Sequence, residues 1–522
     1  MAAEAAAVLL VLGLACCCSA GSVLVVFPVP CRSHGILGSS IVDILLQAGH
    51  QVTYVTPFPV QRDAGGLTVA DISSALLDAA DTEHLDIALL ADRREPAHRL
   101  LQQGGELVRR ALRQPALREL LNDPSATFDA VIADWFYSGL LAPLAAVYDC
   151  PLIWYSGGDA SWQSLQLVHE PSAAAYSAVP QFQKAPSLPF TVGEKIQQQL
   201  LQMYLAAWTY YYTSSVERAA SHAEYSAALQ LRARTPRQYE VLVHNASLLL
   251  INCHAPLAQT LPLSPNVKYV GGHHLSTTTE SLPRELQELL DRSTHGVIYF
   301  SLGSNLKSRD LPENIKRGLL QTFGRLQQTV IWKLEEEVQD LPSNVHVLEW
   351  APQQSLLNHP KLRLFITQGG LLSIMEATQY GVPIVGVPIL GDQFFNVDRA
   401  VQRGCGVKVN FSPELPLKIL EAVHDILANT SYRTNAKLAS SIFRRRLADP
   451  QTELLHWVEL VMETRGAGFL RSPALDVPAV QRLNLDVLLL LALILWFLSK
   501  VVKVINVHLK NDTEENSLKK ND

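Results

Sequence analysis

The sequence predicts an α/β protein built from two facing domains, each with a doubly wound sheet. Length is the first observation, because 522 residues exceed what one ordinary core uses and suit two domains with appendages. The second is the alternation of short apolar runs with amphipathic stretches, the pattern of strands joined by helices. The third is repetition, since a strand, a small-residue turn and a helix start follow one another in each half of the chain.

Composition narrows the classes of function. Apolar residues make up 48% of the chain and the formal net charge is −6, so nothing global indicates nucleic-acid binding. Outside the N-terminal segment four cysteines remain, Cys31, Cys150, Cys253 and Cys405, and they are scattered without metal-ligand spacing. We therefore expect buried free thiols and no metal site.

The N-terminal segment has the features of a secretory signal. Ala5 to Ala15 is apolar, and Cys18-Ser19-Ala20 has the small-residue pattern of a cleavage site. Glu4 stands where a positive charge is usual. We predict that residues 1–20 are a signal peptide.

The C-terminal segment has the features of a membrane anchor. Val487 to Leu498 is a continuous apolar run, and further valines and Ile505 extend it. We predict a transmembrane helix over residues 483–505 and a cytoplasmic tail over 506–522, with a buried C-terminal helix as the alternative.

Together the two ends predict a type I, single-pass membrane protein with a lumenal body. Lys519 and Lys520, just before the terminus, resemble the dilysine retrieval signal of endoplasmic-reticulum membrane proteins. Asn245 and Asn429 stand in glycosylation sequons of the predicted lumenal part. We therefore expect a glycoprotein of the endoplasmic-reticulum membrane.

The first predicted domain, residues 21–280, opens with a βαβ unit. Ser22 to Val26 and Gln51 to Thr56 are strand-forming runs, and Ile36 to Ala48 between them has helical spacing. No G-x-G-x-x-G follows the first strand, so the usual dinucleotide fingerprint is absent. His34 lies between strand and helix, where an imidazole with a pKa of ~6.5 can accept a hydroxyl proton. Capping of the helix start is the alternative.

A carboxylate is predicted to face this histidine. Residues 70–122 have the pattern of two or three helices, and Phe128 to Ala133 is an apolar strand that ends in Asp134. At a strand end Asp134 can orient an imidazole and balance its charge. Alternatively, it caps a helix around Ser138 to Tyr148.

The remainder of this domain is helical and aromatic before a last strand. Glu194 to Tyr225 carries aromatic side chains that can line an acceptor pocket, rest against a membrane surface or pack in the core. These side chains are Tyr204, Trp208, Tyr210, Tyr211 and Tyr212. Leu242 to Asn252 is predicted to be the final strand, and Gly271 to Glu280 the domain boundary.

The second predicted domain covers residues 281–482. Leu282 to Ser293 is an amphipathic helix, and Gly296 to Phe300 is a buried strand that closes in a turn with Ser301 and Gly303. Backbone N–H groups and serine hydroxyls at such a turn can hold phosphate oxygens, although a plain loop has the same pattern. Two more strands and two late helices that close the domain are expected at Val330 to Lys333, Val345 to Leu348, Asn435 to Leu447 and Thr452 to Thr464.

The stretch from Trp350 to Asn396 has the most specific pattern in the chain. Leu362 to Thr367 is a strand-forming run, and the Gly-Gly pair after Gln368 lets the backbone turn closely around a ligand. Leu371 to Tyr380 can form a helix that opens directly on that turn. Its free N–H groups and positive dipole end suit a diphosphate.

A resemblance to a known family rests on the order of residues in this stretch. Pro383 to Pro388 returns as an apolar strand with Asp392 and Gln393 beyond its carboxyl end, where ligands bind in open α/β sheets. Trp350, the Gln-Gly-Gly turn, Glu376 and the Asp-Gln pair resemble the signature of membrane-bound, drug- and steroid-conjugating UDP-glycosyltransferases, most closely the arthropod type. The resemblance covers nearly the whole chain and implies the GT-B fold, with the nucleotide on the C-terminal half.

The resemblance also implies a role for each site residue. On the acceptor side, His34 matches the catalytic base and Asp134 its partner. On the donor side, Trp350 stacks on the uracil, Gln353 hydrogen-bonds the edge of the uracil and Glu376 binds the ribose. The diphosphate is surrounded by Ser301, Gly303, Gln368, Gly370 and Ser373, and the sugar hydroxyls are contacted by Asp392 and Gln393.

Two positions depart from the pattern of the family. Many relatives have histidine where Gln368 stands and asparagine where Leu372 stands. Glutamine can donate to a phosphate but carries no positive charge, so the helix terminus and other N–H groups must stabilise the leaving group. Leu372 removes one polar contact, which bears on the choice of sugar more than on the reaction type.

We expect a metal-independent, inverting transfer of a hexose from a UDP-sugar to a hydroxyl of a small lipophilic acceptor, for detoxification or for hormone or pigment conjugation. The sequence contains no Asp-x-Asp pair, the metal–diphosphate clamp of many other glycosyltransferases. The UDP-sugar is a co-substrate, and no further cofactor is expected. The resemblance to arthropod-type members favours UDP-glucose, and no lysine or arginine of the second motif is an obvious partner for a glucuronate carboxylate. A UDP-glucuronate enzyme and a non-catalytic lumenal lipid- or sterol-binding protein are the alternatives, and a homo- or hetero-oligomer stays open.

Overall fold

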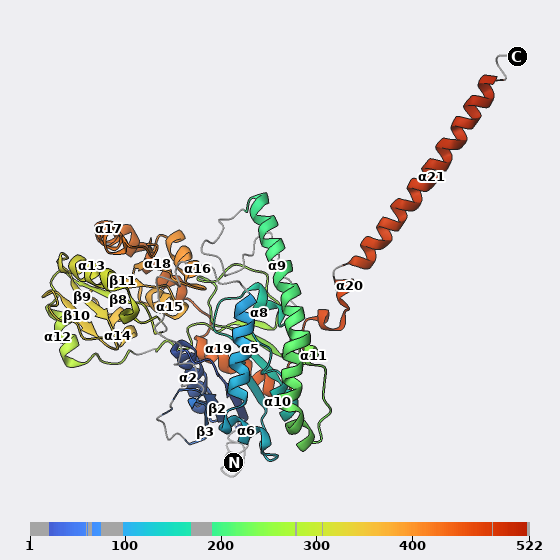
Figure 1. Ribbon diagram of the computed structural model, residues 1–522. Helices are drawn as coiled ribbons and strands as arrows, with labels where there is room; N and C mark the ends of the chain where they lie inside the picture. The colour runs from blue at the N-terminus through green and yellow to red at the C-terminus, as the bar shows by residue number, and fades with distance from the viewer. Residues whose placement is uncertain are drawn as a thin grey trace, which may run out of the picture. The chain divides into compact units, whose positions relative to one another are not determined.

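The computed structural model describes residues 20–58, 60, 65–74, 98–168, 190–276, 279–304, 306–482 and 484–518. Its contacts divide the chain into two units, Met1–Leu470 and Arg471–Asp522. The predicted signal peptide, apart from Ala20, and the lysine pair before the terminus lie outside the described residues. The first unit contains two parallel sheets, each covered by helices (Figure 1).

The first sheet has seven parallel strands in the order β3-β2-β1-β4-β5-β6-β7. Its strands are β1 Ser22–Val26, β2 Gln51–Thr56, β3 Leu67–Asp71, β4 Ala130–Asp134, β5 Leu152–Ser156, β6 Leu248–Ile251 and β7 Val267–Tyr269. The apolar run of β4 is wholly buried, as expected of a central strand with helices on both faces. Because the strand order reverses between β1 and β4, the carboxyl ends of these two strands form the crevice of this sheet.

Two expectations for this sheet were wrong. The first concerns only the start of the helical stretch predicted over residues 70–122: Ala70 lies in edge strand β3, which has few buried side chains to mark it in the sequence. Residues 75–97 lie outside the described residues, and helices α5 (His98–Leu112) and α6 (Pro115–Asn122) confirm the rest of that prediction. The strand predicted at Leu242 to Asn252 is shorter, since its first residues belong to helix α11 (Tyr239–His244), and β7 follows it as the last strand. A short apolar run fits a buried helix as well as a strand.

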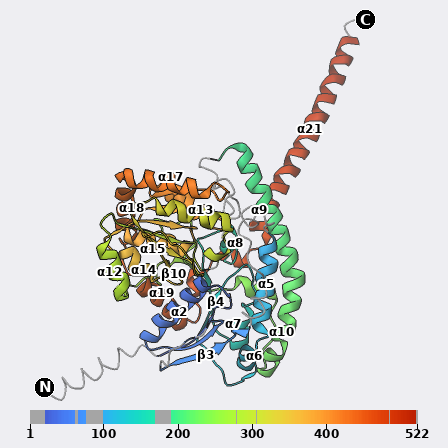
Figure 2. The same cartoon turned by 60° about the vertical axis from the view of Figure 1, so that its left-hand side comes forward.

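Helices cover the first sheet on both faces. They are α2 Arg32–Gln47, α5 His98–Leu112, α6 Pro115–Asn122, α7 Pro143–Tyr148, α8 Trp162–Gln166, α9 Val192–Tyr212, α10 Arg218–Leu231 and α11. A π-helical turn at Thr213–Glu217 joins α9 to α10, so the helical stretch predicted from Glu194 to Tyr225 is confirmed. Figure 2 shows α5, α9 and α10 grouped at one side of this lobe.

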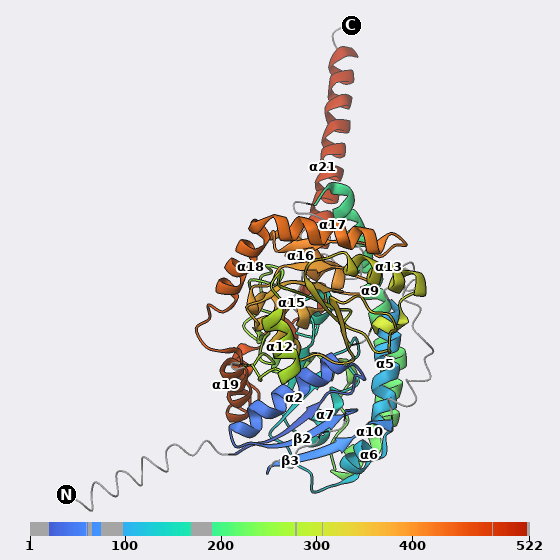
Figure 3. The ribbon, with the colours of Figure 1, turned by 90° about the vertical axis from the view of Figure 1, so that its left-hand side faces the viewer.

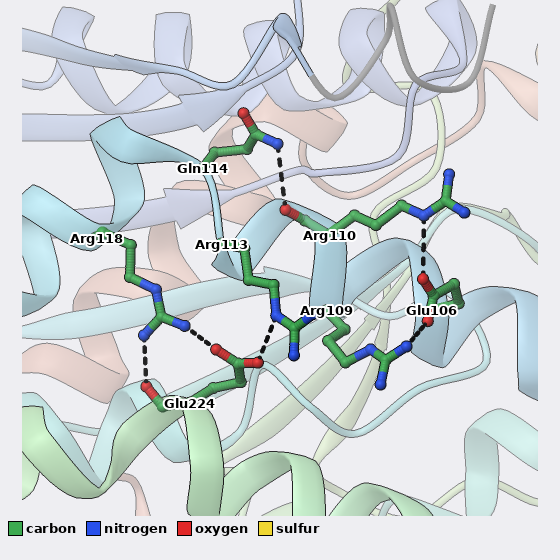
Figure 4. A network of polar contacts seen from close by, with 7 residues as sticks. All are labelled: Glu106, Arg109, Arg110, Arg113, Gln114, Arg118 and Glu224. Atoms are coloured by element: carbon green, nitrogen blue, oxygen red, sulfur yellow. Dashed lines mark hydrogen bonds and ion pairs between the residues drawn. The ribbon is translucent and has the colours of Figure 1, made fainter. Parts of the chain in front are cut away.

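A buried carboxylate ties the helical layer of this lobe together (Figure 4). Glu224 on α10 is 3% exposed, and the Nε of Arg113 lies 2.8 Å from its Oε1. Arg118 on α6 pairs with the same carboxylate and donates to the backbone oxygen of Glu224 at 3.0 Å. Glu106, also in Figure 4, pairs with Arg109 and Arg110 of its own helix at the surface, where such pairs contribute little.

The second sheet has six parallel strands in the order β10-β9-β8-β11-β12-β13. Its strands are β8 Val297–Ser301, β9 Thr329–Lys333, β10 Val345–Leu348, β11 Leu362–Thr367, β12 Ile384–Gly386 and β13 Gly406–Lys408. Its helices are α12 Arg284–Arg292, α13 Glu313–Gly324, α14 Gln353–Asn358, α15 Leu371–Tyr380, α16 Gln393–Gln402, α17 Leu415–Ala428 and α18 Thr430–Phe443. The order reverses between β8 and β11, so this sheet also has a crevice at its carboxyl edge.

The last helix of the first unit crosses back to the first sheet. We expected both late helices to close the second domain, and α18 does pack on α15. In contrast, α19 (Pro450–Glu463) lies beside α2 (Figure 3) and buries Leu454, Val458 and Val461 in the same apolar cluster as Val23 of β1. The apolar face of α19 therefore belongs to the core of the first lobe.

The second unit contains α20 (Ala479–Arg482) and the long helix α21 (Leu485–Leu518). Within Leu485–His508 of α21, an 18-residue window has a mean hydropathy of 2.4, and none of that window is buried. By length and composition the segment can cross a bilayer.

Candidate functional site

The crevice of the first sheet brings together His34 and Asp134. His34 lies in the first turn of α2 after β1, and Asp134 is the last residue of the neighbouring strand β4. The Nδ1–H of His34 donates to Oδ2 of Asp134 at 2.7 Å, and Asp134 is 0% exposed. Neither residue caps a helix, because α2 is preceded by Cys31 and α7 by Ala142.

The surroundings of His34 favour its charged form. Burial alone would lower the pKa of His34, but the ion pair and hydrogen bond with Asp134 and the nearby charge of Asp392 outweigh it, so the pKa lies above 6.5. Asp392 belongs to the second lobe, and Arg32, two residues before His34, also lies 4.7 Å from the ring of Trp350 in that lobe, so the start of α2 faces the second lobe. Since Nδ1 is bonded to Asp134, Nε2 is the ring nitrogen that remains for a substrate.

Aromatic and glycine residues shape the space around this imidazole. The ring of Phe136, two residues after Asp134, stands edge-on to His34 with 5.6 Å between centroids. On another side, a Cβ added to Gly157 would lie 3.2 Å from Cε1 of His34, so the loop after β5 comes close because this residue has no side chain.

The crevice of the second sheet is formed by two glycine turns. Ser301 ends β8 and is the register partner of Thr367 in β11, so the turns that follow these strands lie side by side. Gly303 has a φ of +85° and Gly369 a φ of +89°, both in the region that favours glycine. A Cβ at Gly303 would lie 2.1 Å from Nε2 of Gln368, which shows that the amide of Gln368 rests directly on the first turn.

Helix α15 starts on the second of these turns. Gly370 is the residue before the helix, and among the described residues no side chain caps the N–H groups of its first turn. Those groups and the positive dipole end point to the crevice beside Gln368 and Ser373, which fits an anion such as a diphosphate. The predicted strand–turn–helix at this site is confirmed.

A buried carboxylate lies next to this helix start. Glu376 is 8% exposed, and its burial raises the pKa to about 7. Gln353 donates from Nε2 to Glu376 and, at 3.1 Å, to Oγ of Ser373, while its Oε1 accepts from the Tyr299 hydroxyl at 3.2 Å. The side chain of Gln353, expected at the edge of a uracil, therefore faces Glu376.

Trp350 lies at the mouth of the same crevice and is 52% exposed. The guanidinium of Arg32, from the first lobe, lies 4.7 Å from its ring centroid, and the ammonium of Lys333 lies 5.3 Å away. The guanidinium of Arg32 thus covers the Trp350 ring, on which a flat ligand would have to stack.

Lys333 is a candidate site residue that the sequence analysis missed. It is the last residue of β9, and its side chain is buried. Its Nζ donates to the backbone oxygen of Gly303 at 3.0 Å and pairs with the carboxylate of Glu335. A lysine that closes a buried apolar strand at the carboxyl edge of a parallel sheet was the available signal. It brings a positive charge beside the first glycine turn.

Asp392 and Gln393 begin α16 at the carboxyl edge of the sheet. Asp392 is exposed, and its Oδ2 accepts from Asn396 at 2.9 Å. The Oε1 of Gln393 accepts from the N–H groups of Ile389 and Leu390 at 2.9 and 3.0 Å, which holds the loop before the helix. Leu372, the second departure from the family pattern, packs against the apolar cluster of the first lobe.

Comparison with known proteins supports the family resemblance seen in the sequence, over most of the chain. Residues 106–516 match the family model "UDP-glucoronosyl and UDP-glucosyl transferase". UDP-glucosyltransferase 2 of Dactylopius coccus is 28% identical over 96% of each chain. The human 2-hydroxyacylsphingosine 1-beta-galactosyltransferase is 34% identical over 52% of this chain and 50% of its own.

Solved structures support the fold. A UDP-glucosyltransferase from Polygonum tinctorium aligns with 85% of this chain and 99% of its own, with a TM-score of 0.56 and 16% identity. The glycotransferase of kitacinnamycin aligns with 84% and 99%, with a TM-score of 0.55 and 18% identity. The predicted GT-B fold is confirmed by these matches and by the two parallel sheets. The chain therefore belongs to the UDP-glucuronosyl and UDP-glucosyl transferase family and is a glycosyltransferase that takes its sugar from a UDP-sugar.

Proposed function

We propose that the chain transfers glucose from UDP-glucose to a hydroxyl of a small lipophilic acceptor, with inversion at the anomeric carbon and without a metal ion. The observation that carries this proposal is the 2.7 Å hydrogen bond between His34 and Asp134 in one lobe, at the start of a helix whose Arg32 lies 4.7 Å from the ring of Trp350 in the other. A base in one crevice and an anion-binding helix start in the other are the two halves of a displacement reaction.

The proposed reaction is a single displacement. Nε2 of His34 takes the proton of the acceptor hydroxyl, and Asp134 stabilises the imidazolium that forms. The hydroxyl oxygen bonds to the anomeric carbon while the bond from that carbon to the UDP oxygen breaks, so an α-linked donor gives a β-glycoside. The electron pair leaves with UDP and is stabilised by the N–H groups of α15, the amide of Gln368 and the charge of Lys333.

The proposed donor contacts follow the crevice of the second lobe. Trp350 stacks on the uracil after Arg32 moves from its ring, and Glu376 accepts hydrogen bonds from the ribose hydroxyls. Ser301, Gly303, Gln368, Gly370 and Ser373 surround the diphosphate. Asp392 and Gln393 contact the sugar hydroxyls, and Gln353 supports Glu376 through its hydrogen bond.

Glucose is the proposed sugar because relatives that match the chain over nearly its full length are named for it. These include UDP-glucosyltransferase 2 of Dactylopius coccus and, at 27% identity over 86% of this chain, an ecdysteroid UDP-glucosyltransferase of Lymantria dispar multicapsid nuclear polyhedrosis virus. Glucuronate is the second candidate, since UDP-glucuronosyltransferase 2A3 of Mus musculus is 35% identical over 48% of this chain. The ring of Phe136 beside His34 supports a lipophilic acceptor.

The test is a donor and acceptor panel with the purified full chain. UDP-glucose, UDP-glucuronate and UDP-galactose are each offered with phenols and sterols, and the linkage of the product is determined by NMR. A β-glucoside formed by the natural chain but not by His34→Ala supports the proposal. Formation of a glucuronide would show that glucuronate, and not glucose, is the sugar transferred. Formation of an α-glycoside would refute the inverting mechanism.

We also propose that the protein is a single-pass type I glycoprotein of the endoplasmic-reticulum membrane with both sheets in the lumen. Support comes from α21, from the sequons at Asn245 and Asn429 and from the lysines before the terminus. Protease treatment of sealed microsomes should remove only the C-terminal tail. Digestion of the large unit from the outside would contradict this topology.

A further inference from the structure

A partly buried ion pair joins the loop after β5 in the first lobe to α16 in the second. Oδ2 of Asp159 lies 2.7 Å from Nη1 of Arg399, and the two side chains are 12% and 17% exposed. Arg399 also donates to the backbone oxygen of Leu257 at 3.2 Å, and Asp159 accepts from the N–H groups of Ala160 and Gln259 at 2.8 and 2.9 Å. Backbone groups of the first lobe thus hold both partners in place.

The first-lobe end of this ion pair lies next to the proposed base, His34. Gly157, two residues before Asp159, is the residue whose added Cβ would lie 3.2 Å from Cε1 of His34. Its backbone oxygen accepts from Nδ2 of buried Asn252 at 3.0 Å, which fixes the loop. The same short loop is therefore the wall beside the imidazole and the acceptor for Arg399.

The other end reaches the proposed sugar and diphosphate contacts. Arg399 lies about two helical turns after Asp392 on α16. Between them, Asn396 donates from Nδ2 to Oδ2 of Asp392 at 2.9 Å and to the backbone oxygen of Gly369 at 3.1 Å. A shift of α16 would therefore move the sugar contacts and the glycine turn together.

We infer that Asp159 and Arg399 are a positioning pair that sets the separation between the base in the first lobe and the sugar held by α16 in the second. The inference rests on the proposed function and deepens it. Transfer needs the acceptor oxygen and the anomeric carbon in near-attack geometry, and a misplacement of about 1 Å can cost about 10²-fold in rate. Neither side chain needs to touch a reacting atom for this effect.

The test is a double-mutant cycle in the full chain with Asp159→Asn, Arg399→Met and the double variant. Each single variant should lower kcat for transfer about 10²-fold and leave the affinity for UDP within about 3-fold, because Asn396 keeps α16 and the glycine turn together as one body, so the UDP contacts shift relative to the base but not relative to one another. The double variant should be no slower than the slower single variant. Additive losses in the double variant, or an equal loss of UDP affinity, would overturn the inference.

The chain offers a matched control on the same helix. Nζ of Lys408 lies 2.8 Å from Oδ1 of Asp398, with similar exposed fractions of 20% and 17%, but both residues belong to the second lobe. Asp398→Asn should change kcat by no more than about 3-fold. A loss equal to that of Arg399→Met would show that any weakened ion pair on α16 suffices, and would refute a specific role between the lobes.

Hydrogen exchange separates this inference from the proposed function, because it needs no turnover. In Arg399→Met, amide exchange should rise together in α16 and in residues 257–260, whichever sugar the enzyme uses. If the natural chain transfers no sugar to any acceptor, the proposed function fails while this result still stands. Faster exchange confined to α16 would refute the coupling between the lobes.

Discussion

Replacing Asp134 by asparagine should reduce sugar transfer by ~10²–10⁴-fold, which corresponds to ~3–5 kcal/mol of transition-state stabilisation. The change exchanges a fully buried carboxylate, 2.7 Å from Nδ1 of His34, for a neutral amide of the same shape. With the amide oxygen toward the ring, the imidazolium loses its countercharge. With the amide nitrogen toward the ring, Nδ1 must accept, the proton moves to Nε2 and the base loses the lone pair that faces the acceptor.

The pH dependence of this variant carries a second signature. In the natural chain the pKa of His34 lies above 6.5, because the attraction of Asp134 and Asp392 outweighs burial. The neutral imidazole is the base, so kcat/KM should rise as the pH increases through that pKa. In Asp134→Asn the rising limb should move to lower pH while the plateau falls, whereas general damage to the fold lowers the plateau alone.

The assay is kcat/KM for UDP-glucose and a phenolic acceptor over a range of pH, with the affinity for UDP measured by calorimetry. UDP affinity should change by less than about 3-fold, because the pair lies in the first lobe. His34→Ala provides the control, and the double variant with Asp134→Asn should be no slower than His34→Ala alone, since residues that act as a unit are not additive. A plateau of kcat/KM in Asp134→Asn equal to that of the natural chain, or a large further loss of kcat/KM in the double variant, would refute the reasoning.

Three other perturbations have defined outcomes. Burial raises the pKa of Glu376 from 4.5 to about 7, so ionisation of this carboxyl lowers the free energy of unfolding as the pH rises from 4.5 to above 7. Glu376→Gln removes this loss and should therefore raise the Tm more at pH 8 than at pH 4. Calorimetry should also show weaker UDP binding by the variant. Arg118→Ala should lower the free energy of unfolding, measured in urea, by about 3 kcal/mol, because the buried carboxylate of Glu224 loses one of its two arginine partners. Arg109→Ala, which breaks a pair with Glu106 at the surface, should change it by less than about 1 kcal/mol. Arg32→Ala should tighten UDP binding by about 2- to 5-fold in a fluorescence titration, since a cation–π contact of ~0.5–1 kcal/mol with Trp350 no longer competes, and unchanged or weaker binding would contradict this.

Features predicted well from the sequence are those set by neighbouring residues. The β11–turn–α15 unit follows from a buried apolar run, a Gly-Gly pair and a helical stretch, and Gly369 has the positive φ that such a turn needs. The edge strands β3 and β7 were missed because few of their side chains are buried, so their pattern is weak. For α19 the amphipathic pattern was visible, but not which sheet its apolar face would meet.

The sequence by itself determined the family, the two-domain architecture and the residue types of the site, because each depends on local pattern and on residue order along the chain. Tertiary structure alone decided which side chains meet. His34 and Asp134 are 100 residues apart, Asp159 and Arg399 are 240 apart, and Lys333 reaches Gly303 from a different strand. These contacts exist because strands distant in sequence pair side by side and present their carboxyl ends at one edge, a relation that no local pattern contains.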